Sequence, residues 1–195
     1  MKLRRYWFLV AMLTMVGVFF AGLTIARADS SDGEGDDPTP VCQSDQNDQG
    51  EDSDDQGEDV QGDEQGDDIQ GTEADDELDG NQGDDEIDGD QGNDDICGDQ
   101  GDDVLDGGPG DDVIKGGPGD DVENGQGGDD DVIGNADDDV LRGGPGQDLV
   151  SGKAGSDLIN VRHHGRDKVR CGRGHDVVKA SHNDRVASNC EVVKH

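Results

Sequence analysis

The sequence predicts an all-β solenoid built from nine-residue repeats, and three observations carry the prediction. Glycine recurs every nine residues from Gly62 to Gly152, and an aspartate follows five positions later in all eleven copies. Two positions after that aspartate, ten of the eleven copies have an aliphatic residue. Every aromatic side chain lies between Tyr6 and Phe20, so the rest of the chain cannot build an ordinary globular core. Short strands whose Val, Ile and Leu side chains stack from repeat to repeat are the architecture that remains.

The N-terminal residues 1–28 are predicted to be a signal peptide. A basic start, which includes Lys2 and Arg4, precedes an apolar run, and "ARA" then places small residues before Asp29. The alternative is an uncleaved membrane anchor, because a run of about 20 apolar residues approaches the length of a bilayer span. We therefore expect a secreted protein, with a membrane-anchored protein of the cell surface as the alternative.

The region that follows is strongly acidic, and it contributes most of the net charge of −35. Residues 29–61 have an acidic, low-complexity composition that is typical of disorder. They also fit a decayed repeat that begins near Ser53, with Val60 in the frame of the aliphatic series. Residues 62–160 are predicted to form the repeat region proper.

Residues 161–195 are predicted to form a basic C-terminal cap. This segment holds eight Lys and Arg residues against four acids, together with all five histidines. The nine-residue frame continues through it after a one-residue insertion, which places Asp167 and Asp176 in the aspartate series. A solenoid needs a distinct end, and we expect the last repeats to replace metal ligands by basic residues and a disulfide.

The pattern of aspartates predicts a series of metal sites. When Gly107 is numbered as position one, position six is always Asp, whereas position five also accepts Asn93, Gln147 and Ser156. Solubility alone would not separate the two positions. Stacked carboxylates repel one another, and Ca²⁺ suits carboxylate and carbonyl ligands in flexible geometry better than Mg²⁺ does. The expected side-chain ligands of multiple Ca²⁺ ions are Asp76, Asp85, Asp94, Asp103, Asp112, Asp121, Asp130, Asp139, Asp148 and Asp157.

The glycines before each aspartate predict tight loops whose carbonyl groups can approach a ligand. The clearest copies place the expected backbone positions at Gly107, Gly108, Gly110, Gly116, Gly117, Gly119, Gly143, Gly144 and Gly146. Three residues depart from the pattern. Ala74 and Asp137 stand at position four, where we expect altered loops, and Glu123 replaces the aliphatic residue at position eight. We expect that repeat to be locally shifted, with Val122 beside the core position.

The repeats resemble a known family. "GGPGDDVIK" (107–115) follows the pattern G-G-x-G-x-D-x-U-x of the calcium-binding nonapeptides of RTX proteins. The resemblance implies a parallel β-roll with two repeats per coil and calcium between stacked coils, so that repeat n shares an ion with repeat n+2. The C-terminal segment "CGRGHDVV" (171–178) resembles the ends of small secreted RTX-like proteins.

The four cysteines allow three disulfide connectivities. The spacing of Cys171 and Cys190 exceeds two repeats, or one coil, by a single residue, which favours a bond between them and leaves Cys42 and Cys97 as the second pair. The alternative is a zinc site made of Cys171, His175, His182 and Cys190.

Taken together, these features favour a secreted, monomeric protein whose folding is driven by Ca²⁺. The alternative is a structural spacer or adhesive at the cell surface, whose basic cap binds an anionic cell-wall polymer. We expect no enzymatic activity, because no segment outside the repeats is long enough for a catalytic domain. The negative charge opposes nucleic-acid binding.

Overall fold

The computed structural model describes residues 57–163 and 165–194. The predicted signal peptide and most of the acidic segment lie outside these residues. The described part of the chain consists of sixteen strands without a helix, so it contains no helix of the length and apolarity needed to cross a membrane. This architecture confirms the predicted all-β class.

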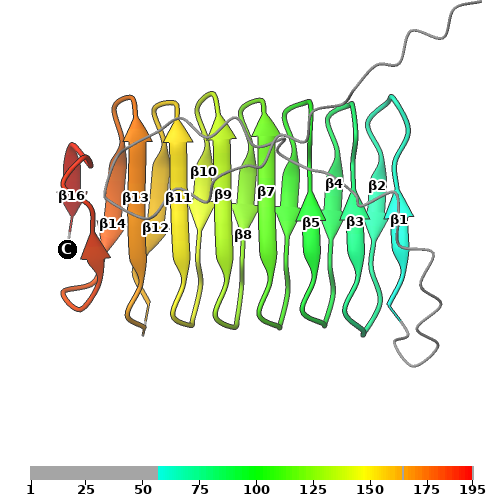
Figure 1. Ribbon diagram of the computed structural model, residues 1–195, viewed down its shortest axis with the longest axis horizontal. Coiled ribbons are helices and arrows are strands. Elements are labelled where there is room, and N and C mark those ends of the chain that lie inside the picture. Colours follow the sequence, from blue (N-terminus) through cyan, green and yellow to red (C-terminus); the bar gives the residue numbers. More distant parts are fainter. Residues whose placement is uncertain (1–56, 164, 195) are drawn as a thin grey trace, which may run out of the picture. The chain divides into compact units, whose positions relative to one another are not determined.

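The strands form two parallel eight-stranded sheets, in which successive strands of the chain alternate between the sheets (Figure 1). The odd sheet contains β1 (Asp59–Gln61), β3 (Glu77–Asp79), β5 (Asp95–Cys97), β7 (Val113–Pro118), β9 (Asp131–Ala136), β11 (Leu149–Ala154), β13 (Lys168–Arg173) and β15 (Arg185–Val186). The even sheet contains β2 (Asp68–Gln70), β4 (Glu86–Asp88), β6 (Val104–Asp106), β8 (Val122–Asn124), β10 (Val140–Arg142), β12 (Leu158–Val161), β14 (Val177–Ala180) and β16 (Val192–Lys194). Each coil of the solenoid therefore holds two repeats, one per sheet, and the predicted parallel β-roll is confirmed.

The register of the sheets follows the sequence period. Leu78 pairs with Ile96, which is two repeats further along the chain. Val150 pairs with Val169, and their spacing exceeds two repeats by a single residue, because the inserted residue lies in the loop between them. The last coils are shorter, since Val178 pairs with Val193, which lies less than two full repeats away.

The core is one column of aliphatic side chains in each sheet, and it is formed by position eight. Side chains alternate along a strand, so the position-eight side chain points inward while those on either side of it point away from the core. The buried members are Ile69, Leu78, Ile87, Ile96, Leu105, Ile114, Val132, Leu141, Val150, Ile159, Val169 and Val178. Val60 packs against this column as the sequence frame predicts.

Glu123 occupies its core position without any shift of the repeat. It pairs in register with Leu105 on one side and Leu141 on the other, and its side chain is fully buried. Val122 points away from the core and remains partly exposed. The expected local shift is therefore wrong: backbone pairing to both neighbouring strands fixes the register, and the acidic side chain follows it inward.

The loops depend on left-handed backbone conformations. Position two has positive φ in every repeat from Asn81 to Lys153, for example 94° at Gly108 and 69° at Asp90. Position four is mostly glycine, with φ of 150° at Gly119, whereas Asp137 at the same position has φ of 76°. The loop at Asp137 is thus altered as expected, and it uses the left-handed region that Asp tolerates better than most residues.

The C-terminal cap fills the interior differently from the repeats. Val161, Cys171 and Ala180 stand at position one, where each repeat of residues 62–160 has glycine, and their side chains are fully buried in the core cluster. Sequence analysis did not assign Val161, Cys171 and Ala180 to the core, although the change from glycine at position one was visible. The cap therefore adds apolar contacts that the repeats do not have.

A disulfide joins Cys171 to Cys190, with a Cα–Cα distance of 5.2 Å, which confirms the predicted pairing. Because both sulfur atoms are in this bond, the alternative zinc site is wrong. Cys97 is also disulfide-bonded, while Cys42 lies outside the described residues.

We expect Gly110→Ala to destabilise the solenoid by about 2 kcal/mol or more. A Cβ at Gly110 would overlap the carbonyl oxygen of Gly92 in the preceding coil, so the two coils would have to separate. Gly127→Ala is the matched control, because a Cβ at Gly127 would meet no atom within 4 Å. Thermal unfolding of both variants in excess calcium tests the packing. Equal midpoints for the two variants would contradict it.

Candidate metal centre

The position-six aspartates form two rows of side chains, one at the start of the strands of each sheet. We call them the even ladder and the odd ladder. The even ladder contains Asp67, Asp85, Asp103, Asp121, Asp139, Asp157 and Asp176, and the odd ladder contains Asp76, Asp94, Asp112, Asp130, Asp148 and Asp167. All are buried except Asp67, which is half-buried near the N-terminal end of the stack. All ten predicted side-chain ligands therefore lie in these ladders.

One oxygen of each carboxylate has a structural role. The N–H of Asp94 donates to Oδ1 of Asp112 at 2.9 Å, and the N–H of Asp103 donates to Oδ1 of Asp121 at 2.9 Å. The donor is always the position-six residue of the preceding coil. Asp fits this position because its short side chain brings an oxygen within reach of the backbone N–H of the preceding coil. Its own N–H in turn donates to the aspartate of the following coil.

The other oxygen, Oδ2, is buried without a hydrogen-bond partner. This holds for Asp85, Asp94, Asp103, Asp112, Asp121, Asp130, Asp139, Asp148, Asp157, Asp167 and Asp176. Buried polar atoms are normally paired, so a whole row of unpaired oxygens indicates a ligand. An ionised carboxylate can accept hydrogen bonds but cannot donate them, so the carboxylates of one row cannot pair with one another. A cation is the partner that these oxygens lack.

Position-one glycine keeps the space beside Oδ2 open. A Cβ on Gly71 would lie 2.7 Å from Oδ2 of Asp76 and 2.5 Å from the carbonyl oxygen of Gly89 in the next coil. A Cβ on Gly107 would overlap Oδ2 of Asp112 in the same way. The absence of a side chain thus leaves a cradle with a carboxylate oxygen on one side and, at Gly71, a backbone carbonyl on the other.

The ladder carboxyls from Asp85 to Asp176 have raised pKa values. Burial is the main cause, carboxylates of adjacent coils add to it, and the donated N–H groups oppose it. The pKa of Asp139 rises to about 8, and those of Asp121 and Asp130 rise to about 7. The pKa rises to about 6 for Asp103, Asp112, Asp148 and Asp157. Without a counterion, Asp121, Asp130 and Asp139 therefore lose their protons only near or above neutral pH.

These residues fit calcium. Ca²⁺ accepts six to eight oxygen ligands from carboxylates and backbone carbonyls and tolerates irregular geometry. The ladder aspartates would hold it through Oδ2, and the loops would add carbonyl oxygens. A bound ion would supply the positive charge that the buried rows lack.

The predicted loop glycines fall into three structural groups. Gly107, Gly116 and Gly143 stand at position one beside Oδ2 of a ladder aspartate, and Gly108, Gly117 and Gly144 have positive φ at position two. Gly110, Gly119 and Gly146 lie at position four against a carbonyl group of the preceding coil. That these glycines bind calcium through their carbonyl oxygens stays a prediction. Their close packing against neighbouring atoms gives an independent reason why each position has glycine.

Position five has a role that the sequence analysis did not find. Asp111 is exposed, and its Oδ1 accepts the N–H of Asp129 in the following coil at 2.7 Å. Asn93 makes the same bond to the N–H of Asp111 at 2.9 Å. The signal was present, since Asp and Asn share a short oxygen acceptor.

The cap continues both ladders before it ends them. Asp167 and Asp176 are fully buried with unpaired Oδ2 atoms, so the expectation that the cap loses these ligands is wrong for its first coil. The ladders end at two other acids: Asp184 accepts the N–H of Asp167 at 3.3 Å, and Glu191 accepts that of Asp176 at 3.0 Å. Shortened loops put these acids out of the nine-residue frame, which is why the sequence did not reveal their role.

We expect Asp112→Asn to raise the calcium midpoint of folding. Asn keeps the Oδ1 acceptor for the N–H of Asp94 but replaces the unpaired oxygen by an amide, which removes a charged ligand. The loss of one site that is filled at ten times its dissociation constant removes about 1.4 kcal/mol of stability. Asp111→Asn is the control and should titrate like the wild type, because Asn93 already occupies an equivalent position. A calcium titration followed by circular dichroism compares the two, and identical midpoints would count against the assigned ligand.

We expect the metal-free chain to gain β-structure on acidification from pH 8 to pH 5. The pKa of Asp139 is about 8 in the folded state, against about 4 for an unfolded aspartate. The folded chain therefore binds protons that the unfolded chain has released, and its stability falls as the pH rises between these values. Circular dichroism in excess chelator measures the effect. A β-signal that grew with pH would show that the carboxyls are not buried as described.

Comparison with known proteins agrees with this geometry. The family model of RTX calcium-binding nonapeptide repeats, which spans four copies, matches residues 61–96, 98–123 and 124–159, about half of the chain. A search of curated proteins gave no match. The matched residues are the glycine loops, the buried aspartates and the core strands described above, and repeats of this type bind multiple Ca²⁺ ions. The chain belongs to the RTX calcium-binding nonapeptide repeat family.

Proposed function

We propose that the chain is a secreted, monomeric calcium-binding protein whose β-roll folds when Ca²⁺ binds. The observation that carries the proposal is the row of buried, unpaired Oδ2 atoms in each ladder. An ionised carboxylate without a partner is costly to bury, and here that cost recurs along the stack from Asp85 to Asp176. Calcium converts the same rows from a source of repulsion into the contact between coils.

The charge balance supports this dependence. Residues 29–160 hold 46 acidic residues and three basic ones, Lys115, Arg142 and Lys153. Lys115 pairs with Asp95 at 3.0 Å on the outer face of the odd sheet. The protein thus supplies very little positive charge of its own near the ladders, and bound cations must provide it.

The cap supports an order of events in which it folds first. Val161, Cys171 and Ala180 give it apolar contacts at position one, and the disulfide constrains its unfolded state. These contributions need no metal. In a solenoid each coil packs only on its neighbours, so a formed cap provides a surface on which the adjacent repeats can order as calcium binds.

Secretion is supported by the cysteines and by the N-terminal sequence. Cys97, Cys171 and Cys190 are all in disulfides, which form and persist in oxidising compartments. The basic, apolar and small-residue segments of residues 1–28 follow the order of an export signal. Extracellular calcium would then be available to the chain after export.

The proposal contains no catalytic step. The buried carboxylates recur at equivalent places along the ladders, which suits repeated binding of one kind of ion.

A second candidate is a structural role at the cell surface, and the basic residues of the cap favour this role. Arg162, Arg166, Lys168 and Arg170 are exposed there and could bind an anionic wall polymer. Protein free in the medium would favour the first role, and protein retained by the cell envelope the second.

We expect the chain to be largely unfolded in excess chelator at pH 7.5 and to become β-rich with millimolar calcium. Far-ultraviolet circular dichroism during a calcium titration measures the change, and magnesium at equal concentration is the control, because Mg²⁺ dehydrates reluctantly and demands octahedral geometry. A full β-spectrum in chelator at this pH would refute calcium-driven folding.

A further inference from the structure

Glu123 is a buried acid that the nonapeptide pattern does not call for. Its side chain is fully buried in the interior column of the even sheet, between Leu105 and Leu141, and neither carboxylate oxygen has a hydrogen-bond partner. An unpaired carboxylate in such a place is strongly destabilising unless it is neutralised. An aliphatic residue in the same place would add to the core, so the acid requires an explanation.

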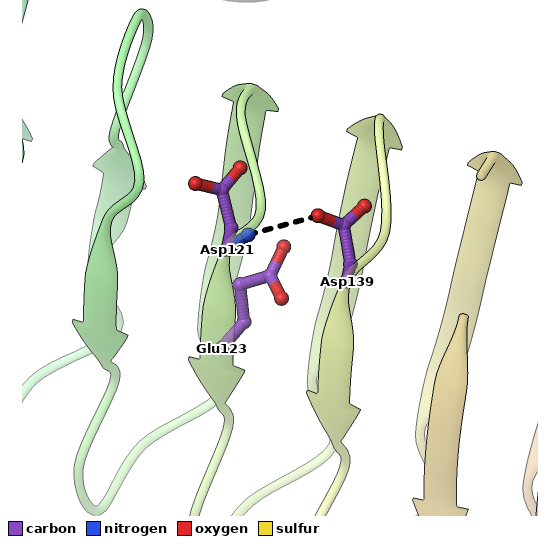
Figure 2. Close-up of side chains that lie close together, drawn as sticks. All are labelled: Asp121, Glu123 and Asp139. Carbon is purple, nitrogen blue, oxygen red and sulfur yellow. Dashed lines mark hydrogen bonds between the residues drawn. The ribbon is translucent and has the colours of Figure 1, made fainter. Parts of the chain in front are cut away.

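The carboxylate of Glu123 points toward the even ladder (Figure 2). One carboxylate oxygen each of Asp121, Glu123 and Asp139 lies within 4.8 Å of the other two, and all three residues are buried. The N–H of Asp121 already occupies Oδ1 of Asp139 at 3.0 Å, whereas Oδ2 of both aspartates is unpaired. Three buried carboxylates therefore bring one oxygen each into the same small region, and both oxygens of Glu123 are unpaired there.

The cradle at Gly116 is lined by oxygens of two of these residues, Asp121 and Glu123. A Cβ there would lie 2.6 Å from Oε1 of Glu123 and would overlap Oδ2 of Asp121. At Gly71 and Gly80, by contrast, the second oxygen beside the position-one glycine is a backbone carbonyl of the next coil. Glu123 thus adds a charged oxygen to the cradle in which other coils have a neutral one.

The charges that act on Glu123 are all negative. Burial raises its pKa well above the ordinary value, and the carboxylates of Asp139, Asp121 and Asp157 raise it further. No basic group contributes to this balance. Of the ligands that proteins bind, a hard divalent cation is the one that three converging carboxylates would select.

We propose that Asp121, Glu123 and Asp139 bind one Ca²⁺ ion through three carboxylates and form the tightest site of the stack. The inference rests on calcium binding by the ladders and adds a side-chain ligand from the interior column. Ligand charge is one of the factors that set calcium affinity in proteins, and a third carboxylate supplies it here. We expect this site to bind at least about tenfold more tightly than the sites made by two ladder aspartates.

Calcium equilibrium dialysis on the full chain, with Glu123→Gln and Glu123→Leu, tests the inference. The wild type should show a first step of one ion per chain, separated from the later ions by about tenfold or more in dissociation constant. Both variants should lose that step and keep the later ones. Glu123→Leu places a residue found in both neighbouring strands at this position, so it should fold. Glu86→Gln is the matched control, because Glu86 is exposed on the outer face of the same sheet.

A spectroscopic measurement separates ligation from a structural role. Europium(III), added alone at less than one ion per chain, should give an excitation line typical of several anionic ligands in the wild type and in Glu86→Gln. Glu123→Gln and Glu123→Leu should lack this line.

An unchanged first binding step or an unchanged europium line in either Glu123 variant would overturn the inference. In that case Glu123 is a protonated core residue, and Glu123→Leu should only raise stability. A wild-type chain that binds calcium without a change in circular dichroism would refute calcium-driven folding and leave this test intact.

Discussion

The stacking of like charges at fixed intervals is the constraint on which the rest of this structure depends. Each coil buries two position-six carboxylates directly beside those of the coils before and after it. In a low-dielectric interior such rows repel one another, and the pKa values of Asp121 and Asp139 are raised mainly by burial and further by this repulsion. The aliphatic column gives only one side chain per repeat to offset this charge. A cation bound between coils would remove the repulsion directly, which is why we propose that folding and calcium binding are coupled.

A single aspartate joins two functions that are usually separate. Oδ1 accepts a backbone N–H from the preceding coil and fixes the distance between coils, while Oδ2 faces the cradle left by the position-one glycine. Asn would keep the first function and lose the charge needed for the second. Glu would displace both oxygens. This double use explains why position six never varies, whereas position five, whose exposed oxygen is only an acceptor, tolerates Asn93.

Most of the architecture could be predicted from the sequence, because the nine-residue period determines which backbone segments pair between coils. Position eight as the core and the frame after the insertion follow from this period. The resemblance to RTX proteins implied two repeats per coil, and the spacing of Cys171 and Cys190 then favoured the bond between them. The errors lie where a residue departs from the period. Glu123 was expected to shift its repeat, since an acid in a core is unfavourable by itself, but pairing on both sides of β8 outweighs that preference. Asp184 and Glu191 could not be found, because the shortened last coils place them by loop geometry and not by spacing.

The direction of the aspartate hydrogen bonds explains why the distinct cap lies at the C-terminal end. Every position-six N–H donates to an acceptor in the following coil, so these N–H groups of the first coils need no acceptor from before them. The last buried donors, the N–H groups of Asp167 and Asp176, have no further repeat to meet and would be left unpaired in the interior, which is costly. Asp184 and Glu191 supply those two acceptors from segments outside the frame, and the Cys171–Cys190 bond links the last of these segments to the core. At position five the bonds run the other way, but those groups are exposed, and water can take the place of a missing partner. The polarity of one buried hydrogen bond thus determines which end of the β-roll requires a specialised sequence.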